Sequence, residues 1–201
     1  MDRILSINVY FARGMFIRFT LLIFYLSSVI FHRRVNEFID IFYKKYSFES
    51  TNRFFIFSLI IPLIVIIILF FYKALRSDKR SLIITLSLVI TPLLLFYYIL
   101  FVSNVEAVHY FQYAIIAVMI FKISDNLLYS FVASTILGVV DEAYQYYVLY
   151  AGVKGLYLDY NDMLFNVHGA IIGLVFYLIV TENIFNSRVR SGIVARLGDS
   201  L

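Results

Sequence analysis

Long apolar runs constrain this chain more than any other feature of its sequence. Hydrophobic residues make up 62% of its 201 residues and charged residues only 15%, which is far from the composition of ordinary soluble domains. One crossing of a membrane needs roughly 20 mostly apolar residues, so the runs and the short links between them predict five or six membrane-spanning helices. The sequence therefore predicts an all-α integral membrane protein that forms one polytopic helix bundle.

The predicted helices divide the chain into three regions. Residues 1–80 are expected to form an N-terminal membrane region of one or two spans with an interfacial segment, residues 81–181 a helical core, and residues 182–201 a polar tail. In the first region we expect a helix at Gly14–Phe31, with basic residues before its apolar run. After it we expect a helix or loop at His32–Arg53 that lies among the lipid headgroups. The later spans are expected at Phe54–Tyr72, Ser81–Ser103, Glu106–Phe121, Asn126–Tyr147 and Asp162–Val180, with Lys122–Asp125 linking the fourth span to the fifth.

Basic residues at the span ends predict the orientation, because Lys and Arg are retained on the cytoplasmic side. This rule places three segments on the cytoplasmic side of the cell membrane: the basic linker Lys73–Arg80, the link at Lys122 and the C-terminal tail. The basic residues of Arg33–Arg53 fall outside in this arrangement, against the rule, so the orientation depends on the later spans. We expect a multi-pass protein of the cell membrane with a cytoplasmic C-terminus.

Each of the last three predicted spans carries one polar or small stripe. At about 100° per residue, Glu106, His109 and Tyr113 share a face of the first of these helices. The other stripes consist of Ser134, Gly138, Asp141 and Gln145 on the second helix, and of Asp162, Asn166, Gly169 and Gly173 on the third. Ionisable residues inside a membrane are costly and usually functional. The stripes predict a shared polar centre near the extracytoplasmic face.

Structural roles compete with functional ones at several of these positions. Adjacent helix residues point about 100° apart, so Asp141 is expected to face inward and Glu142 to cap or pair nearby. A carboxylate at a helix N-terminus can cap free amides, which would explain Asp162 equally well. Gly169 and Gly173 are expected to allow close helix packing. His168 lies roughly 120° from the Asp162 stripe and is left out of the site.

The composition also excludes several classes of function. The chain has no cysteine, which excludes disulfides, thiolate metal sites and cysteine nucleophiles. Its net charge of +4 comes from clusters at span ends, so it indicates membrane topology and no nucleic-acid partner.

Three motifs on the last three spans give the sequence a resemblance to a known family. They are EAVHYFQY, with Glu106, His109 and Tyr113; DEAYQ, with Asp141, Glu142 and Gln145; and DYNDMLFNVHGAIIG, with Asp159, Asp162, Asn166, Gly169 and Gly173. In this order and spacing they resemble the VanZ-like family of bacterial membrane proteins, over about the last half of the chain. The family is named for a protein associated with resistance to the glycopeptide teicoplanin. The resemblance implies a role in the cell envelope, with a lipid-linked cell-wall precursor or a glycopeptide as partner besides the membrane lipids.

Three functions are compatible with these residues. In a membrane enzyme, Glu106, His109 and Asp141 would be the catalytic candidates. Substrate-binding candidates are Tyr113, Gln145, Asp159, Asp162 and Asn166. A metal-dependent variant would use His109, Glu106, Asp141 and Asp162 around Zn²⁺ or Mg²⁺, although the sequence contains no metal motif and identifies neither a metal nor another cofactor. The second function is binding of an envelope molecule or partner without chemistry, and the third is a small transporter.

Overall fold

The computed structural model describes residues 2–57, 64, 68, 72, 87, 89–95, 98–100, 104–153 and 157–181, of which residues 2–13, 104, 105 and 179 are described by their backbone alone. Within these residues all regular structure is helical and no strand is found. The principal helices are α1 (Asp2–Tyr46), α4 (Val108–Ser124), α5 (Leu127–Tyr144) and α6 (Tyr160–Val180). A short 3₁₀ helix, η1 (Asn104–Ala107), precedes α4, and a π-helix, η2 (Gln145–Leu149), continues α5.

Among the described residues, three helices are long and apolar enough to cross a membrane, namely Gly14–Tyr46, Leu127–Leu149 and Tyr160–Leu178. Val108–Ser124 is also apolar but shorter. These helices are consistent with the predicted membrane protein. The predicted spans Phe54–Tyr72 and Ser81–Ser103 fall largely outside the described residues, as does the tail from residue 182.

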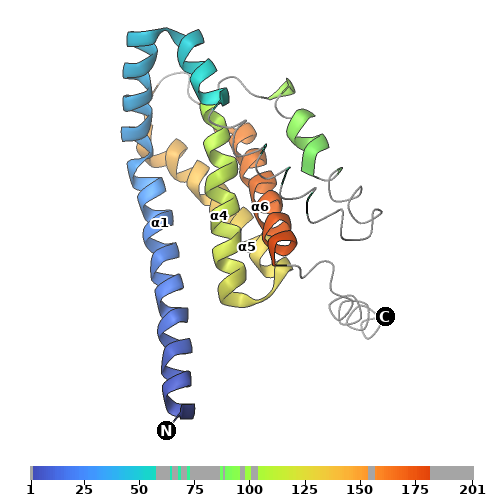
Figure 1. Cartoon of the computed structure of the whole chain (residues 1–201). Coiled ribbons are helices and arrows are strands. Elements are labelled where there is room, and N and C mark those ends of the chain that lie inside the picture. Colours follow the sequence, from blue (N-terminus) through green and yellow to red (C-terminus); the bar gives the residue numbers. More distant parts are fainter. Residues whose placement is uncertain are drawn as a thin grey trace, which may run out of the picture.

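Helices α4, α5 and α6 pack side by side, and α1 runs along α4 (Figure 1). One apolar cluster joins α4 to α6 through Ala117, Phe121, Ala170 and Leu174. A second cluster of Tyr113, Ile116 and Ile120 packs against Leu21, Phe24 and Tyr25 of α1 and against Ala133 and Leu137 of α5. The Tyr25 hydroxyl also donates a hydrogen bond to the Leu137 carbonyl at 3.0 Å. These contacts fix the four helices as one bundle.

Glycines let α4 and α6 approach closely, as the sequence predicts. A Cβ added at Gly169 would lie 2.7 Å from the Tyr110 carbonyl oxygen, and one at Gly173 would collide with the backbone of Ala114. Only hydrogen fits at these two positions, because the obstacle in each case is backbone that cannot rotate away. Packing between small residues is a main source of helix association in membranes.

The expected helix Gly14–Phe31 is too short at both ends, because α1 runs without a break from Asp2 to Tyr46. Of the helix and the loop expected for His32–Arg53, the structure has a helix that is interrupted at Ser47. No Gly or Pro interrupts the segment after Phe31, and the exposed pair Arg33–Glu37 has the spacing that supports a helix. The helix ends where Ser47 adopts a left-handed backbone with φ of 69°, and helix resumes at residues 48–57. The polar half of α1 is therefore a helical extension of the first apolar stretch.

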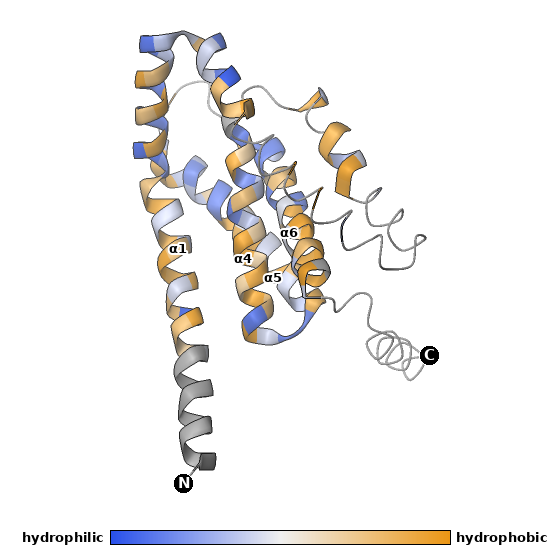
Figure 2. Ribbon diagram, viewed as in Figure 1, coloured by the Kyte–Doolittle hydropathy of each residue, from blue (hydrophilic) through white to orange (hydrophobic). Residues whose placement is uncertain are grey.

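The link between α4 and α5 is shorter than the predicted Lys122–Asp125. Asp125 ends α4 in a left-handed conformation with φ of 51°, and Asn126 caps α5 by accepting a hydrogen bond from the Tyr129 amide at 2.9 Å. Two residues therefore complete the turn. The antiparallel helices place the start of α4, the end of α5 and the start of α6 at one end of the bundle, where Figure 2 shows hydrophilic stretches gathered.

Replacing Gly173 by Ala tests the contact between α4 and α6. The added methyl group would force the helix backbones apart, so we expect unfolding in detergent to require about 1 to 3 kcal/mol less free energy than in the wild type. The measurement is thermal or denaturant unfolding of the purified protein. Gly14→Ala is the matched control, since a Cβ there meets nothing within 4 Å and Ala is the better helix former. Equal stability of the two variants would contradict the packing role.

Candidate functional site

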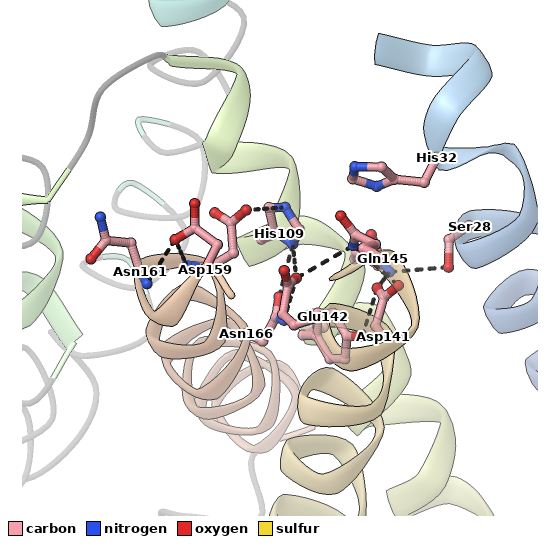
Figure 3. A network of polar contacts seen from close by, with 12 residues as sticks. Ser28, His32, His109, Asp141, Glu142, Gln145, Asp159, Asn161 and Asn166 are labelled. Atoms are coloured by element: carbon pink, nitrogen blue, oxygen red, sulfur yellow. Dashed lines mark hydrogen bonds and ion pairs between the residues drawn. The ribbon is translucent and has the colours of Figure 1, made fainter. Parts of the chain in front are cut away.

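His109 lies at the centre of a buried polar cluster at the end of the bundle where α4 and α6 begin (Figure 3). It lies in the first turn of α4, and only 4% of the residue is exposed. Its Nε2 is 3.3 Å from Asp162 Oδ2, and its Nδ1 is 3.0 Å from Asn166 Oδ1. Both partners belong to α6, so the close contact between α4 and α6 brings three of the predicted site residues together.

Glu142 faces this cluster, and the expectation that it only caps or pairs nearby is wrong. The residue is 3% exposed, and its Oε1 lies 3.9 Å from His109 Nδ1. The same oxygen accepts long hydrogen bonds of 3.5 Å from Asn166 Nδ2 and Gln145 Nε2. Because α5 packs against both α4 and α6, faces of α5 that differ by about 100° are both buried.

Asp141 is also buried but points toward a different set of side chains. Its Oδ2 accepts hydrogen bonds from Tyr113 Oη at 3.0 Å and Gln112 Nε2 at 3.2 Å. Its Oδ1 accepts one from Gln145 Nε2 at 3.2 Å. Gln112 also donates to Ser28 Oγ of α1 at 3.0 Å. Tyr113, predicted to bind substrate, is fully buried and holds Asp141 in place.

Asp159, and not Asp162, caps the start of α6. The Asp159 Oδ1 accepts hydrogen bonds from the amides of Asn161 at 2.9 Å and Asp162 at 3.3 Å. Partial burial, with a further contribution from the Asp162 carboxylate, raises the pKa of Asp159 above its ordinary value. The Asp162 side chain is thereby left to face His109, and its Oδ1 is buried without a hydrogen-bond partner among the described residues.

A cavity of about 620 Å³ opens beside the cluster. Four predicted site residues line it, namely Glu106, Gln145, Asp159 and Asp162. The other lining residues are Glu142, Tyr146, Tyr150 and Tyr157, and His32, Asn36, Ile39, Asp40 and Tyr43 from α1. His109, Asp141, Tyr113 and Asn166 lie behind this wall. Five of the described lining residues are acidic and none is Lys or Arg, so the cavity is strongly acidic.

Helix α1 contributes part of the site that the sequence analysis missed. Asn36 Nδ2 donates to the Tyr150 hydroxyl at 2.9 Å and lies 3.0 Å from His32 Nε2. The His32 ring centroid is 6.3 Å from that of His109. His32 and Asn36 are four residues apart and share a helix face, a signal hidden by the basic residues between and around them.

Two further observations delimit the cluster. His168 is buried but packs edge-on against the Tyr110 ring, with centroids 5.5 Å apart, so its exclusion from the site agrees with the structure. One candidate ligand atom from each of His109, Glu142 and Asp162 lies within 4.8 Å of the other two. The metal ligands considered from the sequence included Glu106 and Asp141, whereas the structure brings Glu142 to His109 and Asp162.

The π-helix η2 explains how the end of α5 reaches the cavity. A π turn inserts a residue into the helix and turns the following side chains, and such turns are frequent at functional sites. Gln145 begins η2, is 7% exposed and bonds to both Asp141 and Glu142. It therefore joins the Asp141 contacts to the His109 cluster.

Removing the Tyr113 hydroxyl tests the support of Asp141. Tyr113→Phe would leave a buried carboxylate oxygen with one donor fewer, so the expected loss is about 1 to 3 kcal/mol of unfolding free energy. Unfolding of the purified variant in detergent measures it. Tyr129→Phe makes the same chemical change at an exposed residue of α5 and should leave stability unchanged. A Tyr113→Phe protein as stable as Tyr129→Phe would argue against this support.

Comparison with known proteins gives no match, either to a protein-family model, to a curated protein sequence or to a solved structure. The resemblance to the VanZ-like family therefore stays a prediction that depends on the motif residues.

Proposed function

We propose that this chain is a VanZ-like integral membrane protein of the bacterial cell envelope that binds the polar part of a lipid-linked or cell-wall molecule in its acidic cavity. The observation that carries the proposal is the position of the motif residues. Glu106, Gln145, Asp159 and Asp162 come from three motifs and line one cavity at the end of an otherwise apolar bundle.

The lining chemistry supports a sugar or peptide as the bound group. Carboxylates accept hydrogen bonds from hydroxyl and amide N–H groups, and the Gln145 amide and Tyr146 hydroxyl can donate as well as accept. Among the described lining residues, five are acidic and none is Lys or Arg, which disfavours direct contact with a phosphate. In a lipid-linked precursor the sugar or peptide would then enter the cavity.

The predicted orientation supports access from outside the cell. With the last span ending in the cytoplasm, the start of α6 and the loop before it lie on the extracytoplasmic side, and so does the cavity that Asp159 and Asp162 line. Together with the two predicted spans between residues 54 and 103, the described helices would make a bundle of five or six spans. Glycopeptides and the cell-wall molecules they bind are met on this side of the membrane.

The contacts of the serines in α5 disfavour the transporter. Ser130 and Ser134 are fully buried toward the opposite end of the bundle, and their hydroxyls donate to Asn126 and Ser130 carbonyls of their own helix. Such hydroxyls are already satisfied and offer little to a passing solute. Binding alone and catalysis would use the same pocket, so an experiment has to separate these two functions.

Glycopeptide susceptibility and lipid-linked precursor profiles in cells expressing His109→Ala or Asp141→Asn test the function. Expression of the wild type should shift susceptibility severalfold, and both variants should lose the shift because both disturb the cluster beside the cavity. If the wild type also changes the precursor profile and both variants lose this change, the protein acts as an enzyme. If susceptibility shifts while the precursors stay the same, the protein acts by binding. Asp125→Asn is the matched control, since this exposed turn lies at the opposite end and Asn tolerates a left-handed backbone. No response from the wild type at equal membrane abundance contradicts the envelope role.

Reporter fusions test the orientation separately. A reporter fused after Arg188 should be cytoplasmic, and one inserted within Ala151–Leu158 should be external. A third insertion at the Asp125–Asn126 turn should again be cytoplasmic, because Lys122 marks that end as retained. The reverse pattern would place the cavity at the cytoplasmic face and overturn the proposed substrate class.

A further inference from the structure

The cluster beside the cavity contains more buried negative charge than its own residues can neutralise. Glu142 and Asp162 have side chains that are 3% and 15% exposed, and their partner among the described residues that can carry positive charge is His109. Charges buried away from water are stable only when they are paired or coordinate a metal. One imidazolium can balance one carboxylate, so the second requires another cation or a proton.

The contacts of Asn166 determine which nitrogen of His109 is available. Asn166 Nδ2 donates to Glu142 Oε1, so its carbonyl oxygen is the atom that faces His109 Nδ1 at 3.0 Å. A carbonyl oxygen only accepts, which places a proton on Nδ1. In the neutral imidazole the lone pair is then on Nε2, 3.3 Å from an oxygen of Asp162. Two acceptors at this distance need a positively charged atom between or beside them.

We propose that His109 Nε2 and the carboxylates of Glu142 and Asp162 bind one divalent transition-metal ion of the Zn²⁺ class. Two carboxylates, a neutral imidazole and a divalent cation together carry no net charge, which resolves the imbalance. Asn166 would be the positioning residue, because metal-bound imidazoles usually donate their other N–H to an acceptor that fixes the ring. The inference depends on the cluster and not on the proposed envelope function.

The spacing of the atoms fits such an ion after small side-chain rotations. One nitrogen of His109 and one carboxylate oxygen from each of Glu142 and Asp162 lie within 4.8 Å of one another. Glu142 Oε1 lies 3.9 Å from His109 Nδ1, so the Glu142 carboxylate has to turn toward Nε2 to share the ion with it. Around Zn²⁺, with bonds of about 2.0 to 2.2 Å, ligand atoms are about 3.4 Å apart in a tetrahedron. The buried Asp162 Oδ1, which has no hydrogen-bond partner among the described residues, allows that carboxylate to turn. Three protein ligands leave a fourth position, and Glu142 and Asp162 both border the cavity from which it would be filled.

The mixture of ligands selects the class of ion. An imidazole nitrogen favours Zn²⁺ and its neighbours in the transition series, whereas Mg²⁺ and Ca²⁺ prefer oxygen-only sites. The alternative occupant of the space between His109 and Asp162 is a proton, which would make an imidazolium–carboxylate pair. A pair of this kind needs no metal, so the two descriptions differ in a measurable way.

Titration of the full chain, purified in detergent and stripped with a chelator, tests the site with Zn²⁺ and Co²⁺ as probes. We expect one Zn²⁺ per chain with affinity well above that for Mg²⁺, and visible Co²⁺ absorption of a four- or five-coordinate ion. Glu142→Gln and Asp162→Asn should weaken binding at least about 100-fold, and Asn166→Leu about 10- to 100-fold. Asp40→Asn is the matched control, since Asp40 lines the same cavity but is exposed and outside the cluster.

Absence of saturable Zn²⁺ binding to the wild type would overturn the proposal in favour of the proton-sharing pair. The proposal would also be overturned if the Glu142→Gln and Asp162→Asn variants bound Zn²⁺ as tightly as the Asp40→Asn control. Helical circular dichroism and elution volume verify that each variant is folded. If a ligand variant fails to fold, the Co²⁺ spectrum of the wild type decides, because an octahedral spectrum without an imidazole contribution would exclude this site. Precursor profiles have no part in this readout, so the metal site and the envelope function fail independently.

Discussion

The backbone contact between α4 and α6 is the constraint on which the rest of the structure depends. Gly169 and Gly173 let α6 lie against Tyr110 and Ala114, and this sets His109 of α4 directly beside Asp162 and Asn166 of α6. With a larger residue at either glycine, the helices would separate and distances of about 3 Å between the polar groups would be lost. The same approach leaves α5 to cover the remaining side with Glu142 and Gln145.

The polar cluster persists in an apolar bundle because its members satisfy one another. Asp141 accepts three hydrogen bonds, from Tyr113, Gln112 and Gln145. Gln112 also bonds to Ser28 of α1, and Gln145 also bonds to Glu142. Buried polar groups of this kind are costly when one partner is missing. Because a shift of one helix would leave such a group without its partner, the network favours one arrangement of the four helices. It thereby also fixes the side chains beside the cavity.

Helical periodicity in the sequence predicted the residues on α4 and α6 well and those on α5 and α1 less well. His109, Asp162 and Asn166 lie on single buried faces of their helices, so a single stripe described them correctly. Glu142 was misjudged because α5 is buried on two faces, which periodicity along one helix cannot show. His32 and the continuation of α1 were hidden by flanking charges that also suit a headgroup segment. Asp159 replaced Asp162 as the cap because the helix begins two residues earlier than its apolar pattern suggests.

The proposed ligand, a lipid-linked precursor, is anionic, and the proposed metal site would reduce its repulsion by the acidic cavity. Lipid-linked precursors carry phosphate, and the described lining residues include five acids and no Lys or Arg. Direct contact between a phosphate and these carboxylates would be repulsive, because like charges a few ångströms apart repel one another. A divalent ion between Glu142 and Asp162 would neutralise two of the carboxylates and offer an open coordination position to an oxygen ligand. With such an ion bound, the cavity would repel a nearby phosphate less strongly, and the proposed entry of the sugar or peptide of a precursor would still be possible without it.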